Sequence, residues 1–300
     1  MNKIESERQG ELLIICEVLV YAFFPIVVNY TTKLMPPILF AGVGAIMAGV
    51  VLFTYILIKK QLPKLKNIQA LKYILSVTLF VTIIPSILIF TGTSKTSGIN
   101  TTILLQTEIL FAFFICGVFA GEKITPQRIG GAIIVVIGAI AILYNGTLQI
   151  NRGDLLIIAG TFFFPIGGIY GKKALKITTP AVILFVRSIL GGTILVLISL
   201  LFENYQVSFS GYVVDNFKFI LLNGVFICGL SRLLWYEGLK RLDISKATSL
   251  AISYPAFSLF YSYVFLKEIP TIFQGIGFII IFGGIFILTY KRKRGNFVEK

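Results

Sequence analysis

The sequence predicts an all-α membrane protein with ten transmembrane helices, arranged as two inverted five-helix repeats. Three observations lead to this fold class: an apolar composition, ten apolar runs of membrane-spanning length, and a similarity between the two halves. Of the 300 residues, 56% are hydrophobic and only 13% are charged, whereas a soluble domain has about 25% charged residues. A soluble protein of this composition would lack the polar surface that keeps a fold in solution. Lipid is therefore the solvent that fits the chain.

Ten apolar runs approach the length of about 20 residues that a helix needs to cross a hydrocarbon layer about 30 Å thick. Short gaps with helix-terminating residues, such as Pro36-Pro37 and Thr179-Pro180, separate the runs. No gap is long enough for a soluble domain, and the charged N-terminus before a long first run does not resemble a cleavable signal peptide. The predicted spans are 12–32, 37–58, 72–92, 98–119, 128–145, 154–172, 180–202, 218–238, 246–266 and 272–290.

Lysine and arginine are distributed unequally between the gaps. With the N-terminus in the cytoplasm, 20 of the 27 lie on the cytoplasmic side, 5 lie outside, and Arg187 and Arg232 lie within spans. This bias predicts a multi-pass protein of the cytoplasmic membrane with both termini in the cytoplasm, and it favours an even number of spans. Since topology accounts for the net charge of +14, no nucleic-acid partner is expected.

The cysteine and histidine content argues against a metal centre. The chain has no histidine, and Cys16, Cys116 and Cys228 each stand alone in an apolar run, so neither a metal-ligand spacing nor a disulfide framework is present. We interpret the cysteines as small packing residues. The sequence also has no nucleophile–base pair and no nucleotide-binding loop. We therefore expect no cofactor and no enzymatic activity.

A shift of 146 residues aligns 73–144 with 219–290 without a gap. Because each half then holds five spans, an odd number, the second half enters the membrane from the opposite side. We predict a first repeat in 1–148 and a second, inverted repeat in 149–300, which together would offer two states of similar energy, each open to one side. The matching polar and glycine positions are Gly92 with Gly238, Thr102 with Thr248, Glu122 with Glu268, Thr125 with Thr271, Gly131 with Gly277 and Gly138 with Gly284.

Two segments share a pattern of Glu, a turn with Thr or Pro, Gln, and then spaced glycines. They are GEKITPQRIGGAIIVVIGA at 121–139 and KEIPTIFQGIGFIIIFGG at 267–284. In this pattern the chain resembles the EamA family of the drug/metabolite transporter superfamily. The resemblance covers nearly the whole chain, and it is specific for the fold but not for the substrate.

The two halves depart from the family pattern in different ways. Pro255 of the ninth span is matched by Ile109 in the fourth, and Arg187 of the seventh span is matched by Val43 in the second. In the proteins that the chain resembles, spans one, three, four, six, eight and nine line a central cavity. This implies that Arg187 lies off the lining helices. The residues that the resemblance places on lining helices are Glu17, Asn29, Glu108, Arg232, Tyr236 and Tyr254.

Ionisable residues within the spans are candidate functional groups, because a charge at the centre of the bilayer costs about 2.5–3.5 kcal/mol on insertion scales. Glu108 lies near the middle of the fourth span. There it would be a protonatable coupling group or the counter-charge of a cationic substrate. The alternative is a neutral glutamic acid bonded to a neighbouring backbone carbonyl.

Arg187, Arg232 and Glu17 lie at similar depths, about 10 Å from the cytoplasmic edge at 1.5 Å per residue. An arginine at this depth would bind a substrate carboxylate or phosphate with two hydrogen bonds. Alternatively, Glu17 pairs with one arginine as a structural bridge, or all three side chains extend to the interface. We single out Arg187 as the residue of a possible structural ion pair.

Aromatic residues accompany these charges. Trp235 and Tyr236 follow Arg232, and Tyr254 lies in the ninth span. Arg232 and Tyr236 are four residues apart and so share one helix face. Such rings would line a cavity or belong to an interfacial belt. The predicted substrate-binding residues are Glu17, Asn29, Glu108, Arg232, Trp235, Tyr236 and Tyr254.

We therefore expect a secondary transporter, an exporter or a uniporter, that moves a small polar metabolite such as an amino acid by alternating access. One alternative is efflux of organic cations or drugs, with Glu108 and the aromatic rings as the binding surface. Another is a carrier of phosphorylated or lipid-linked sugars, with the arginines on the phosphate. The expected partners are a small-molecule solute and membrane lipid, and the chain is expected to be a monomer or a homodimer.

Overall fold

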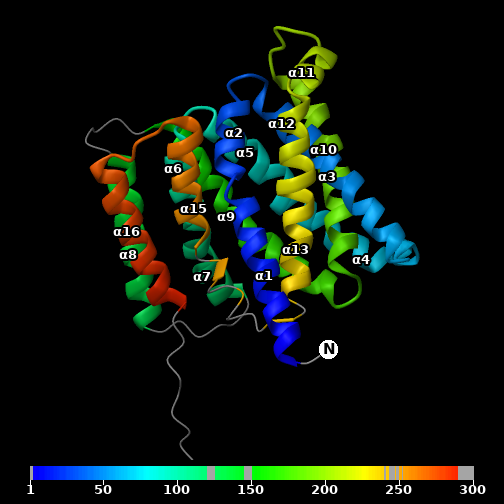
Figure 1. The fold of residues 1–300 in the computed structure, drawn as a ribbon, viewed down its shortest axis with the longest axis horizontal. Helices are drawn as coiled ribbons and strands as arrows, with labels where there is room; N and C mark the ends of the chain where they lie inside the picture. Colours follow the sequence, from blue (N-terminus) through cyan, green and yellow to red (C-terminus); the bar gives the residue numbers. More distant parts are fainter. Residues whose placement is uncertain are drawn as a thin grey trace, which may run out of the picture.

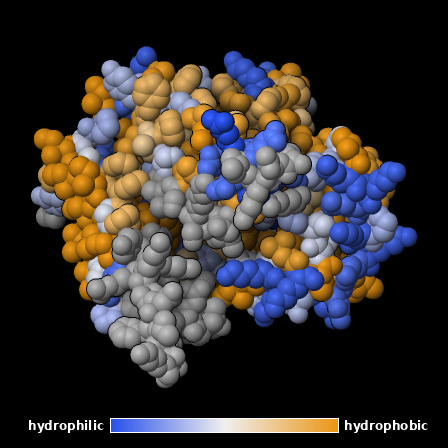
Figure 2. Space-filling view, turned by 60° about the horizontal axis from the view of Figure 1, so that its bottom comes forward, coloured by the Kyte–Doolittle hydropathy of each residue, from blue (hydrophilic) through white to orange (hydrophobic). Residues whose placement is uncertain are grey.

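The fold is a bundle of helices joined by short turns (Figure 1). The computed structural model describes residues 3–119, 126–144, 151–239, 241–242, 247, 250–251 and 253–289. Within these ranges there is no strand, as the sequence predicts. The helices α8 (Pro126–Tyr144) and α16 (Ile272–Thr289) lie at the left of Figure 1. Both carry exposed apolar side chains, and Figure 2 shows a hydrophobic surface on the same side.

Among the described residues, seven helical segments are long and apolar enough to cross a membrane. Two shorter apolar helices cover Ile129–Tyr144 and Ile272–Ile287. These nine segments coincide with nine of the predicted spans, and the remaining one, 246–266, is described only in part. The all-helical membrane class is thus confirmed, while the count of ten stays a prediction. The seven segments are Glu5–Thr31, Pro37–Ile58, Ile68–Thr93, Gly98–Ile115, Arg152–Leu175, Pro180–Phe202 and Phe217–Leu239.

Several of the spans are built from more than one helix. The first half contains α1 (Lys3–Tyr21), α2 (Phe24–Thr31), α3 (Pro37–Ile58), η1 (Leu62–Lys66), α4 (Ile68–Val77), η2 (Thr78–Ile83), α5 (Ile84–Thr93), α6 (Gly98–Leu104), α7 (Thr107–Phe119) and α8. The second half contains α9 (Arg152–Leu175), α10 (Pro180–Phe202), α11 (Phe209–Asp215), α12 (Phe217–Leu221), η3 (Leu222–Leu230), α13 (Ser231–Leu239), α15 (Tyr254–Tyr261), η4 (Ser262–Leu266) and α16.

The breaks inside the spans have identifiable causes. Pro25 lies in the first turn of α2, where its missing N–H and its ring interrupt the hydrogen bonds that would continue α1. Pro255 likewise starts α15, whereas Pro165 lies inside the continuous helix α9. The fourth span turns between α6 and α7, where the Thr107 hydroxyl donates to the Leu104 carbonyl at 2.7 Å. The sequence predicts a single helix over 98–119, whereas in the structure this span is divided into α6 and α7.

Three of the described spans contain π-helical segments, η2, η3 and η4 (Ser262–Leu266), and the first two lie at corresponding positions. Six residues of η2, Thr78–Ile83, and nine residues of η3, Leu222–Leu230, have π geometry. The shift of 146 residues places 78–83 on 224–229, inside η3. Segments of π-helix are rare and frequently lie at functional sites, so both spans are candidates for cavity walls.

Close glycine contacts join helices from the two halves. A Cβ atom built on Gly138 of α8 would lie 2.9 Å from the Gly277 carbonyl oxygen of α16, and one on Gly277 would lie 2.9 Å from the Gly138 carbonyl oxygen. A larger residue at either position would push the helices apart, which is why small residues line close helix crossings in membranes. α3 and α10 cross in the same way at Gly42 and Gly192.

The first helix of each half packs against the other half. α9 packs against α5, where Gly153 meets Gly92, and α1 packs against α13, where Gly10 meets Gly238. The two halves are therefore intertwined, and neither forms its core alone.

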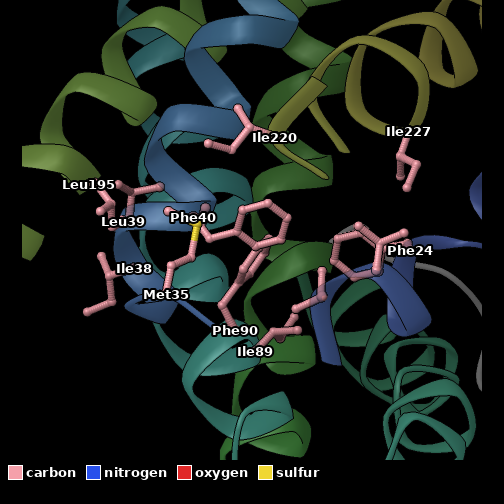
Figure 3. Close-up of a cluster of buried hydrophobic side chains, with 13 residues drawn as sticks. Phe24, Met35, Ile38, Leu39, Phe40, Ile89, Phe90, Leu195, Ile220 and Ile227 are labelled. Carbon is pink, nitrogen blue, oxygen red and sulfur yellow. The ribbon is translucent and has the colours of Figure 1, made fainter. Parts of the chain in front are cut away.

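Side chains seal the end of the bundle where α3 begins. A cluster of buried residues that includes Phe24, Phe40 and Phe90 fills this end (Figure 3). The ring of Phe90 meets those of Phe24 and Phe40 edge-on, at 5.8 and 5.9 Å between centroids. Beside this cluster, the Asn100 amide donates to the Asp154 carboxylate at 3.0 Å and accepts from Gln274 at 2.7 Å. Buried polar groups need such partners because an unpaired one is costly.

Two carboxylates cap helices that are distant in sequence. Glu203 accepts hydrogen bonds from the Ile38 and Leu39 amides at 2.9 and 3.0 Å, at the start of α3. Glu268 accepts from the Gly98 and Ile99 amides at 3.1 and 3.0 Å, at the start of α6. Each carboxylate satisfies N–H groups that a helix start leaves unpaired, and its charge is favourable there. Glu122, which the repeat alignment matches with Glu268, lies outside the described residues.

The Glu203 cap leads to a stability prediction. Glu203→Ala should lower the free energy of unfolding by about 1–3 kcal/mol, because two amides lose a charged acceptor. Glu203→Gln keeps one acceptor oxygen and should lose less. Thermal unfolding of the purified protein in detergent measures both changes. An alanine variant as stable as the original chain would contradict the cap role.

Candidate functional site

A cavity of about 470 Å³ lies between the two halves of the bundle. Its wall includes Tyr21 and Glu108 of the first half and Arg187, Arg232 and Trp235 of the second. Two of the π-helical segments contribute as well, η2 through Val81 and Thr82 and η3 through Asn223 and Cys228. The volume falls within the range of roughly 300–1,000 Å³ that is typical of small-molecule sites.

The cavity is closed at one end and reaches the surface at the other. Phe24, Ile89 and Phe90 belong both to the cavity wall and to the buried cluster of Figure 3, so that cluster forms the floor. At the opposite end the wall includes Lys172 and Leu175, which are exposed near the end of α9. A solute would therefore enter from the end of the bundle where α9 terminates and α10 begins.

Glu108 presents its carboxylate to the cavity from the first turn of α7. This position follows the turn between α6 and α7, so the N-terminal end of a helix lies beside the carboxylate. The partial positive charge of that helix end favours an anion there. The side chain is exposed, and no hydrogen bond to it is found within the described part of the chain. Glu108 is thus available to a solute.

Arg232 is held against the wall by two neighbours on α1. Its guanidinium carbon lies 4.0 Å from the centre of the Tyr21 ring, and its Nη1 lies 3.9 Å from Glu17 Oε1. Glu17 is only 4% exposed and also accepts a hydrogen bond from Ser231 Oγ at 3.3 Å. A guanidinium over an aromatic face is stabilised by the ring's negative quadrupole. Arg232 is therefore fixed in place while part of its side chain, 32% exposed, faces the cavity.

Arg187 is a second arginine on the wall, contributed by α10. The resemblance implies a position off the lining helices, and the structure corrects this. The sequence also singles out Arg187 for a structural ion pair, but the pair with Glu17 forms at Arg232. Within the residues that the structure describes, Arg187 has neither an ion pair nor a hydrogen bond. Its guanidinium therefore keeps its full set of donors for a solute.

The other predicted site residues divide into two groups. Trp235 and Tyr236 line the cavity. Tyr254 lies behind the wall: it is 8% exposed, and its ring lies 5.2 Å from that of Tyr21. Asn29 is fully buried and lies outside the cavity wall, because its amide donates to the Thr93 and Thr96 carbonyls at 3.0 and 2.7 Å. The Asn29 oxygen accepts from the Lys33 amine at 2.9 Å. In this structure Asn29 ties α2 to the end of α5.

Tyr21 lines the cavity and contacts Arg232, but the sequence analysis does not single it out. It lies one helical turn after Glu17 on α1, so the two side chains share a face. That spacing beside a buried carboxylate is the signal that would have identified it. For Lys172, at the mouth, the sequence indicates only a cytoplasmic charge of the topology signal.

The apolar spans and the cavity define an all-helical, multi-pass membrane protein. A sequence family described as "EamA-like transporter family" matches residues 8–144 and again 151–290. The chain belongs to this family, as the resemblance in the sequence implies.

Curated relatives agree with this class. The chain is 25% identical over 252 residues to the uncharacterized transporter YyaM of Bacillus subtilis, covering 82% of this chain and 80% of that protein. It is 24% identical over 289 residues to an uncharacterized transporter of Archaeoglobus fulgidus, covering 94% and 97%. A transporter of Methanothermobacter thermautotrophicus is 26% identical over 227 residues, and the match spans 73% of this chain and only 65% of that relative.

A solved crystal structure has the same fold. It superposes with a TM-score of 0.65 at 16% sequence identity, over 93% of this chain and 95% of the other. At this identity the match supports the fold alone.

The contact between Tyr21 and Arg232 leads to a prediction about binding. Tyr21→Leu should weaken the affinity for a transported solute about fivefold, because Arg232 loses a ring contact that contributes about 1 kcal/mol. Tyr21→Phe keeps the ring and should bind nearly as the original chain does. Titration of each purified variant with a solute found by thermal-shift screening measures the affinities. Equal losses in both variants would contradict the ring contact.

Proposed function

We propose that the chain is a secondary transporter that moves a small zwitterionic metabolite, such as an amino acid, across the cytoplasmic membrane by alternating access. The observation that supports this proposal is the pair Glu108 and Arg187. The two opposite charges line one cavity and come from different halves, and within the described part of the chain neither forms an ion pair within 4.0 Å or a side-chain hydrogen bond. A zwitterion offers an ammonium group to the first and a carboxylate to the second.

The charge balance of the cavity separates the alternatives. An organic cation would meet the guanidinium groups of Arg187 and Arg232, which oppose it. A phosphorylated sugar would suit these arginines and Lys172 at the mouth, but it would meet the carboxylate of Glu108 on the same wall. A zwitterion can place its ammonium group at Glu108 and its carboxylate at Arg187, so it is the substrate class that we favour.

Within this proposal each predicted site residue has a defined part. Glu108, Arg187 and Arg232 bind the charged groups, and Trp235 and Tyr236 form the apolar wall. Tyr21 and Glu17 position Arg232. Tyr254 supports Tyr21 from behind, and Asn29 acts through the helix packing described above rather than on the solute.

The inverted repeat and the ten spans belong to the same proposal. Two observations support a division into repeats at 1–148 and 149–300. The family pattern matches once in each half, and exchanging the halves maps helix contacts onto one another. Thus α5 on α9 corresponds to α13 on α1, and η2 on α10 corresponds to η3 on α3. Two similar halves would rock about the cavity between two states.

We infer that this structure is open to the cytoplasm. The cavity mouth at Lys172 lies at the end that the excess of lysine and arginine assigns to the cytoplasm. The phenylalanine cluster around Phe90 closes the other end. For transport to occur this cluster would open and the mouth would close.

The charge pair leads to a transport prediction. Arg187→Gln and Glu108→Gln should each lower zwitterion uptake into proteoliposomes about 10- to 100-fold, because each loses a charged hydrogen bond worth about 1.5–3 kcal/mol. Lys95→Gln removes a charge outside the cavity and should leave uptake unchanged.

Analogues separate the two roles in the same assay. Uptake of an amine that lacks a carboxylate should be unchanged by Arg187→Gln. Uptake of a carboxylate that lacks an amine should be unchanged by Glu108→Gln. Uptake that is unaffected by both substitutions would overturn the zwitterion site.

The orientation is tested by labelling. In a variant with Cys16, Cys116 and Cys228 replaced by serine, Lys95→Cys should react with an impermeant maleimide added to intact cells. Lys64→Cys should react only after the membrane is opened. The reverse pattern would place the cavity mouth on the outer side.

A further inference from the structure

The mouth end of the bundle has a strongly basic surface. Two segments contribute exposed lysines, 59–72 from the end of α3 to the start of α4, and 172–176 at the end of α9. Neither segment contains an acidic residue. We call this set the lysine surface, and its members are Lys59, Lys60, Lys64, Lys66, Lys72, Lys172, Lys173 and Lys176.

The two segments are held together as one surface. The Thr179 hydroxyl donates to the Gln61 side-chain oxygen at 2.7 Å, which joins the start of α10 to the turn after α3. Leu65 of η1 packs against a buried cluster that contains Ala174 and Ala181. Lysines from both segments therefore lie over one apolar cluster. Part of this surface is visible as the blue region at the right of Figure 2, beyond the end of α3.

Exposed apolar side chains lie among the lysines of the first segment. Ile58 and Ile68 are 72% and 73% exposed, and Leu62 is 41% exposed. Such exposure is costly in water but favourable at the boundary between acyl chains and headgroups. Lysine stems lie along apolar surface while their amines extend to the polar layer. The segment thus has the composition of an interfacial element.

The opposite end of the bundle lacks this imbalance. Its lysines, including Lys95, Lys218 and Lys267, share that end with the carboxylates of Glu203 and Glu268. Positive-inside topology requires only an excess of lysine and arginine. It does not require two lysine-rich segments without any acidic residue, nor exposed isoleucines beside those lysines.

We propose that the lysine surface binds anionic phospholipid headgroups of the cytoplasmic leaflet, with phosphatidylglycerol as the probe lipid. Clusters of lysines directly beside a membrane attract anionic lipids, at about 1 kcal/mol for each lysine near the surface. The apolar residues Ile58, Leu62 and Ile68 would contact the acyl chains of the same lipids. The proposal rests on the membrane orientation inferred above but not on the substrate, and its test needs no transport.

The experiment compares two triple variants that remove the same charge. Purified full-length protein in a neutral detergent is titrated with fluorescent phosphatidylglycerol. Lys60→Gln/Lys64→Gln/Lys66→Gln should bind about 100-fold more weakly than the original chain. The control Lys95→Gln/Lys218→Gln/Lys267→Gln should bind as the original chain does. The variants are matched in backbone as well, because Lys60 and Lys267 both have positive φ, 53° and 58°.

Three outcomes would overturn the proposal. They are equal losses in both triple variants, equal binding of phosphatidylcholine, and displacement of the lipid by millimolar inorganic phosphate, which would indicate a site for soluble anions. If the first triple variant fails to fold, the salt dependence of lipid binding by the original chain tests the proposal instead. Its binding of phosphatidylglycerol should weaken at least tenfold between 0.05 and 0.5 M salt, because salt screens exposed charges (~14 Å and ~4 Å screening lengths). Salt-independent binding would equally overturn it.

Discussion

The free energy of holding charges inside an apolar bundle governs how this cavity is built. A buried guanidinium or carboxylate is tolerated only with a partner or with water. Arg232 has partners on one helix, the Glu17 carboxylate and the Tyr21 ring. Glu108 and Arg187 instead face the open volume. The cavity is therefore the place where the fold keeps those charges that it does not neutralise itself, and a solute that neutralises both would stabilise a closed form.

One end of the bundle is packed so that it excludes water, and we call it the dry end. The other end is open to water, and we call it the wet end. Aromatic and aliphatic side chains around Phe40 and Phe90 fill the dry end, and the Asn100–Asp154 hydrogen bonds and the Glu203 cap satisfy the polar groups beside it. The wet end has Lys172 at the mouth and the lysine surface around it. Because the dry end excludes water by packing, opening it would require whole helices to move.

Much of the fold follows from the sequence, because span length and apolar composition are set by the thickness of a bilayer. The family also follows from the motifs at 121–139 and 267–284. The contents of the cavity follow less well. The turn before Glu108 is stabilised by the hydrogen bond from the Thr107 hydroxyl to the Leu104 carbonyl. No residue pattern in the sequence predicts this turn. The sequence analysis expects Asn29 on the cavity wall and Arg187 away from it, and the structure has the reverse. The direction of a side chain on an apolar helix depends on tertiary packing, which the sequence pattern does not contain.

The exchange of first helices between the halves has a consequence for biosynthesis. α1 packs against α13, and α9 packs against α5. When α1 leaves the translocon, the face that will contact α13 has no protein partner and lies against lipid. It obtains that partner only after about two hundred further residues, up to Leu239, have been inserted. The buried Glu17 on that face lies in the bilayer without its ion-pair partner until Arg232 is inserted. This charge pair therefore forms late in membrane insertion.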